Sequence, residues 1–126
     1  MVPGCAGSFW GATTAETLAA ADAVAEDGVS AEVIDVATLR PLDMATILDS
    51  VERTGRCVIA HEAVLSGGFG GEIAARIADA GLMHLLAPVK RVAAYDTIVP
   101  LPRLEKYFFP DRDRLMSAVQ SIMDYQ

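Results

Sequence analysis

CVIAHEAVLSGGFGGEIAARI, residues 57 to 77, is the stretch of this 126-residue chain that decides the fold. It starts with an apolar run, Cys57 to Ala60, which ends at His61 and Glu62. A loop with four glycines follows, and then Ile73 and Ile77 recur at helical spacing. A buried strand, a turn and a helix form the repeating unit of α/β domains. Ligands and partners of such domains collect at the carboxyl ends of the strands, so we expect functional residues at this turn.

Similar units lie on both sides of this stretch. Gly28 and Gly55 end predicted helices, and Asp43 begins one as an N-cap. The expected helices cover residues 13–27, 43–55, 70–81 and a last one starting at Asp111 or Asp113, and the expected strands cover 31–36, 57–60 and 89–94. Residues 96–110, with three prolines, are expected to run extended over the surface. The alternation predicts a mostly parallel sheet with helices on both faces.

Size and composition predict one domain, residues 1–126, in which residues 1–9 carry the poorest strand pattern. Hydrophobic residues make up 52% of the chain, which is high for this length and suggests a buried contact with another domain or subunit. No apolar run is long enough to cross a membrane, and no signal peptide is visible. The net charge of −7 argues against nucleic acid and would suit a basic partner surface.

The residues that follow the central strand allow two interpretations. His61 and Glu62 either contact a neighbouring subunit or ligand, or they simply end a strand in solvent. The glycine loop from Ser66 to Glu72 could bind an anion, but it matches neither the Walker nor the dinucleotide pattern. Close backbone packing at a tight turn is the favoured explanation of its glycines. Asp96 is either a turn former or an acid that receives a partner's Arg or Lys.

Neither a metal site nor a nucleophile with its base is visible in the sequence. His61 lacks a second histidine at ligand spacing, and His84 is distant. Cys5 and Cys57 are interpreted as free thiols in a reducing cytoplasm. From the residues alone we therefore expect an α/β domain with no catalytic, cofactor-binding or metal-binding residues of its own.

An ordered set of segments resembles a known family. The segments are AEVID (31–35), TLRPLD (38–43), TGR (54–56), HEA (61–63), SGGFGGEI (66–73), APV (87–89) and YDT (95–97) with Pro100. Their order and spacing are similar to the C-terminal domain of the β subunit of thiamine-diphosphate-dependent 2-oxoacid dehydrogenases. The HEA and YDT segments resemble the branched-chain members more than the pyruvate members.

This resemblance implies a transketolase C-terminal-type fold. It is a three-layer α/β/α sandwich around a five-stranded, mostly parallel sheet, with the first strand antiparallel to the rest. One departure concerns the first strand, which is usually β-branched but reads GCAGS here at residues 4–8. That strand is therefore expected to be frayed or missing.

The resemblance also implies a supporting role. In that family thiamine diphosphate and Mg belong to the complete enzyme, at a site between the α subunit and the other domain of the β subunit. This domain would then bind no cofactor, would be inactive alone, and would contact other β-subunit domains, the α subunit, the acyltransferase's binding domain and further copies of itself. The candidate interface and docking residues are His61, Glu62, Ser66, Gly67, Gly68, Phe69, Gly70 and Asp96. Alternatives are a stand-alone dimerising module, or the equivalent domain of a transketolase or a deoxyxylulose-phosphate synthase.

Overall fold

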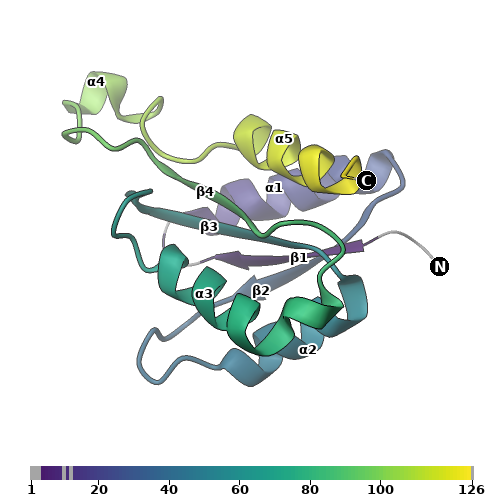
Figure 1. Ribbon diagram of the computed structural model, residues 1–126. Helices are drawn as coiled ribbons and strands as arrows, with labels where there is room; N and C mark the ends of the chain where they lie inside the picture. The colour runs from purple at the N-terminus through teal and green to yellow at the C-terminus, as the bar shows by residue number, and fades with distance from the viewer. Residues whose placement is uncertain (1–3, 10, 12, 126) are drawn as a thin grey trace.

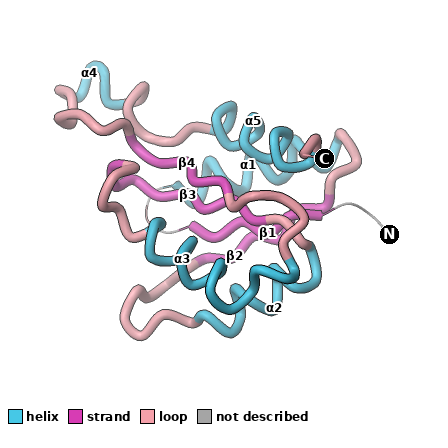
Figure 2. Tube along the Cα trace, viewed as in Figure 1, coloured by secondary structure: helices cyan, strands magenta, loops and turns pink. Residues whose placement is uncertain are grey.

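The computed structural model describes residues 4–9, 11 and 13–125, which form a sheet covered by helices on both faces (Figure 1). The strands are β1 (Gly4–Phe9), β2 (Ser30–Asp35), β3 (Cys57–Val64) and β4 (Lys90–Ala94). The helices are α1 (Thr13–Glu26), α2 (Met44–Thr54), α3 (Gly70–Gly81), α4 (Pro102–Glu105) and α5 (Arg112–Met123), with a 3₁₀ turn at Leu82–His84. Strand and helix alternate along the first three-quarters of the chain, as the sequence pattern predicts (Figure 2).

The described strands form one sheet in the order β2-β1-β3-β4, and every pair is parallel. β1 pairs along its whole length with β2 and also pairs with the first half of β3. The strand predicted to be frayed or missing is therefore an inner strand of the sheet. The expected fifth strand is not found among the described residues, and the expected antiparallel first strand is wrong for β1.

Two hydrophobic clusters hold the three layers together. One lies between the sheet and helices α1 and α5, and includes Ala20, Val58 and Leu115. The other lies under α2 and α3, and includes Ile47, Ile59 and Ile73. Figure 1 shows the same pairing of helices, with α1 and α5 on one face and α2 and α3 on the other. Because neighbouring strand residues point to opposite faces, Val58 and Ile59 fall in different clusters, so β3 is buried on both sides.

The helix ends follow the capping chemistry of the sequence. The Asp43 side chain accepts the N–H of Thr46 at 3.1 Å, and Asp111 accepts the N–H of Arg114 at 2.8 Å. Gly55 ends α2 in the left-handed conformation (φ +71°), with its N–H bonded to the carbonyl of Val51. All three caps satisfy backbone groups at helix ends.

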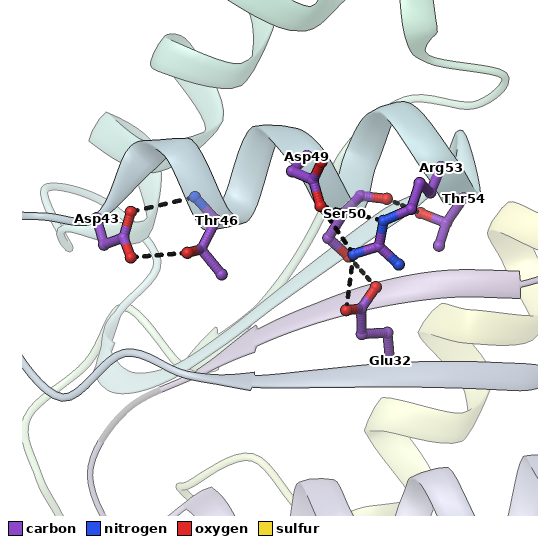
Figure 3. A network of polar contacts seen from close by, with 7 residues as sticks. All are labelled: Glu32, Asp43, Thr46, Asp49, Ser50, Arg53 and Thr54. Atoms are coloured by element: carbon purple, nitrogen blue, oxygen red, sulfur yellow. Dashed lines mark hydrogen bonds and ion pairs between the residues drawn. The ribbon is translucent and has the colours of Figure 1, made fainter.

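A polar network fastens the outer strand β2 to α2 (Figure 3). Glu32 on β2 accepts a hydrogen bond from the Ser50 hydroxyl at 2.6 Å and pairs with Arg53 at 2.9 Å. Arg53 also pairs with Asp49 one turn earlier on α2. These contacts lower the pKa of Glu32, with the hydrogen bond from Arg53 as the largest cause.

Residues 95–107 extend from the carboxyl end of β4 and project from the sandwich; we call this segment the arm (Figure 1). It was predicted to be extended, but Pro102 begins the short helix α4, where a proline loses no helical hydrogen bond. Large apolar side chains of the arm are exposed, with Ile98 90% and Leu101 82% accessible. None of the helices in the described part of the chain is long and apolar enough to cross a membrane.

Candidate functional site

The candidate site is the rim at the carboxyl end of β3. The register between β3 and β4 shifts between His61 and Val64, which is a bulge at the end of the strand. The His61 side chain is fully buried on the side of α3. The Glu62 carboxylate lies beside Gly11, in the connection between β1 and α1. The two residues thus point to opposite faces, as strand alternation predicts, but His61 does not end the strand in solvent.

The glycine loop folds directly over the imidazole of His61. A Cβ built on Gly68 would lie 2.6 Å from His61 Cε1, and one built on Gly70 would lie 2.5 Å from its Cδ2. Both separations are too short for real atoms, so only glycine lets the loop approach this closely. This confirms close packing as the physical reason for Gly68 and Gly70. Gly67 differs, because its φ of +74° requires glycine for the turn itself.

Burial lowers the pKa of His61. Desolvation is the main cause, since the charged imidazolium would lose its hydration under the loop. A backbone hydrogen bond at Ala63 opposes this shift, and the positive charge of Arg91 adds to it. The lowered pKa favours the neutral form of His61, which packs beneath the glycine loop.

Asp96 and Ser66 join the glycine loop to the end of β4. One carboxylate oxygen of Asp96 accepts the backbone N–H of Ser66 at 2.8 Å, and the other accepts its hydroxyl at 2.6 Å. These bonds lower the pKa of Asp96, with the hydroxyl as the first cause. We call this pair the clasp. The structure thus brings together two candidate residues that lie 30 positions apart in sequence.

A groove of about 830 Å³ lies between the loop that precedes α2 and the glycine loop. Its walls carry Leu39, Pro41 and Phe69 together with three arginines, Arg40, Arg76 and Arg91. Arg76 pairs with Glu72 one turn earlier at 2.7 Å. Sequence reasoning did not identify these arginines, because they come from three separate elements and no motif connects them.

The rim does not fit the diphosphate group of thiamine diphosphate with its Mg ion. No set of three His, Cys, Asp or Glu side chains close enough to hold a metal ion occurs within residues 4–9, 11 and 13–125. The first turn of α3 carries Glu72, which disfavours a second anion at that helix end. Cys57 is buried and forms no disulfide with any described residue, as predicted, whereas the side chain of Cys5 lies outside the described part.

Comparisons with known proteins agree with this architecture. Residues 9–115 match the family described as "Transketolase, C-terminal domain". Pyruvate dehydrogenase E1 component subunit beta of Bacillus subtilis is 39% identical over 116 residues, and the β subunit of 2-oxoisovalerate dehydrogenase of Dictyostelium discoideum is 41% identical over 117. Each alignment covers 92% of this chain but only 36% and 31% of the respective relatives.

A solved structure titled "Split gene transketolase, inactive beta4 tetramer" has the same fold. It superposes with a TM-score of 0.82 over 99% of this chain and 40% of its own, at 28% identity. The family match over most of the chain and this superposition lead to one conclusion: the chain belongs to the transketolase C-terminal domain family.

Proposed function

We propose that this chain acts as the C-terminal domain of the β subunit of a 2-oxoacid dehydrogenase. The complete enzyme would decarboxylate a 2-oxoacid on thiamine diphosphate with Mg and transfer the acyl group to a lipoyl arm. The observation that carries the proposal is identity of 36–41% across 92% of the chain to β subunits of pyruvate and 2-oxoisovalerate dehydrogenases. The transketolase alternative has the weaker support, from a structure at 28% identity.

Within that enzyme the proposed role is association and docking. The rim supports this role because its polar side chains bond within the domain. His61 is covered by the glycine loop, and both oxygens of Asp96 are bonded to Ser66. The rim would then present a preformed surface to the other β-subunit domain and the α subunit. We also propose a cytoplasmic location, because Cys57 forms no disulfide with any described residue, which suits a reducing compartment.

The arm would form the docking surface for the acyltransferase's binding domain, together with Asp96. It begins at the clasp and exposes Ile98, Leu101 and Leu104, a set of side chains suited to burial against a partner. The same exposure favours a second candidate function, a stand-alone module that dimerises through the arm.

A binding experiment with two purified proteins tests the proposed role. The chain is mixed with the acyltransferase's binding domain and binding is measured by calorimetry. We expect binding that weakens in the Asp96→Ala variant, because the clasp no longer fixes the base of the arm. The matched control is Asp79→Ala, an exposed acid on α3 outside the rim. Unchanged binding by Asp96→Ala would remove Asp96 from the surface, and binding of thiamine diphosphate by the chain alone at micromolar affinity would contradict the supporting role.

A further inference from the structure

The outer edge of β4 is bordered by positive charge from both faces of the sheet. β4 is the last strand in the order, and no described strand pairs with its outer side. Lys90 and Arg91 are exposed at its start, and Arg114 comes from α5. A groove of about 580 Å³ follows this edge, and its lining includes these three residues. Three cationic residues along one strand edge are notable in a chain whose net charge is −7.

The peptide groups of β4 show which residues face outward. The carbonyl of Ala94 accepts the N–H of Leu65 at 3.2 Å, so it points toward β3. The carbonyl of Ala93 accepts Arg114 Nη2 at 2.6 Å on the opposite side. Because peptide groups alternate along a strand, those of Arg91 point outward with Ala93. An extended segment lying here would therefore find a backbone N–H and C=O at Arg91, beside that residue's own charge.

Among the described residues, the two acids in the groove form no ion pair with these three cations. Asp111 bonds to the backbone N–H of Arg114 as the cap of α5, and Asp113 pairs with Arg112. Arg91 donates to the carbonyl of Leu65 at 3.1 Å, and its charge helps to lower the pKa of Asp96. The guanidinium of Arg114 lies 4.5 Å from the ring centre of Tyr95, which fixes it over the edge.

We propose that the outer edge of β4 is a docking strip for an extended, acidic segment of another protein. The segment's backbone pairs with β4 at Arg91, and its carboxylates lie against Lys90 and Arg91, with Arg114 adding to the local field. A second copy of this chain is a poor occupant, because edge-to-edge pairing about a two-fold axis brings the same three cations together. Lys90, Arg91 and Arg114 are not among the residues proposed to dock the acyltransferase's binding domain, so failure of the strip would leave the proposed function standing.

Fluorescence anisotropy tests the strip with a short labelled peptide that alternates Glu and Val. We expect saturable binding to the chain that weakens with added salt, and none by a peptide in which Lys replaces Glu. The Lys90→Gln/Arg91→Gln double variant should bind roughly fivefold or more weakly, since two exposed ion pairs are lost. The matched control, Arg103→Gln/Lys106→Gln, removes two exposed cations of the arm and should bind as before.

Nuclear magnetic resonance of the unaltered chain provides a second readout that does not depend on a variant's folding. The amide signals of Arg91 and Ala93 should shift on adding the acidic peptide. Absence of binding would mean that the cations only shield the edge from pairing, and would overturn the proposal. Complete displacement by inorganic phosphate at millimolar concentration would also overturn it, in favour of a small-anion site.

Discussion

Gly70 shows how a single methyl group decides the packing of the rim. An added Cβ would overlap the His61 ring and lie 3.2 Å from Ile59 Cγ2, both in the buried layer. We expect Gly70→Ala to lower the free energy of unfolding by about 1–3 kcal/mol, as overpacking does elsewhere. Urea unfolding followed by circular dichroism measures this change.

The neighbouring Gly71 is the matched control. A Cβ there would lie 3.3 Å from Arg91 Nη1, the far end of a flexible side chain that can move aside. Gly71→Ala should be neutral or slightly stabilising, because alanine is the better helix former. Equal losses in both variants would contradict the role given to His61.

His61 also makes stability depend on pH. Its pKa in the folded chain is lower than the ordinary value of about 6.5, so the unfolded chain binds more protons below that pH. The stabilising contribution is fully present above about pH 6.5 and is lost as the pH falls toward the folded pKa. We expect unfolding free energy to decrease between pH 7.5 and 5.5, by urea denaturation at each pH.

Two variants separate this effect from other titrations. His61→Asn cannot gain the proton, so its stability should change less over the same pH interval. His84→Gln alters the other histidine, which is exposed, and should retain the pH dependence. If His61→Asn follows the same pH profile as the unaltered chain, another group is responsible.

At the scale of elements, β1 shows how small residues in an inner strand affect the stability of the fold. An apolar cavity of about 30 Å³ lies beside Gly7, between the sheet and the small side chains Ala20 and Ala21 of α1. A Cβ on Gly7 would make only ordinary contacts, at 3.7 Å from the carbonyl oxygen of Glu32 and 4.0 Å from Thr17 Cγ2. Gly7→Ala should therefore stabilise the fold by about 0.5–1 kcal/mol, measured as a higher urea midpoint.

Gly55→Ala is the matching variant, for which we expect a change in stability of the opposite sign. Gly55 has a positive φ, and a Cβ would lie 2.7 Å from Leu86. This variant should lower the urea midpoint. A destabilised Gly7→Ala would show that the space beside β1 is not available to a methyl group.

The elements also show which features local sequence can predict. Asp43 and Gly55 delimit α2 because capping depends on a few adjacent residues. The residues of β1 carry little strand propensity, and its place between β2 and β3 comes from pairings with distant residues. The burial of His61 likewise depends on a loop that folds back over it, and the clasp joins residues of two different loops. Such tertiary contacts leave no local pattern in the sequence.

At the scale of the whole molecule, the arm predicts association. Ile98 and Leu101 are almost fully exposed, which is costly for a chain that exists alone. We expect the chain to self-associate in a concentration-dependent way. The Ile98→Ser/Leu101→Ser variant should associate at least about tenfold more weakly. Sedimentation velocity over a range of concentrations measures both.

Leu18→Ser is the matched control, because Leu18 is a half-exposed leucine of α1 and not part of the arm. It should associate as the unaltered chain does. A chain that stays monomeric at high concentration would show that the arm needs a different protein as its partner.

The inner position of β1 has a consequence for how the chain can be shortened. Removing an outer strand would narrow the sheet by one member, but β1 lies between β2 and the pair β3–β4. Loss of β1 would leave β2 without its sole neighbour among the described strands. The sheet would then be divided into β2 alone and the pair β3–β4. During synthesis, β1 has both of its sides occupied only after β2 and β3 have also emerged from the ribosome.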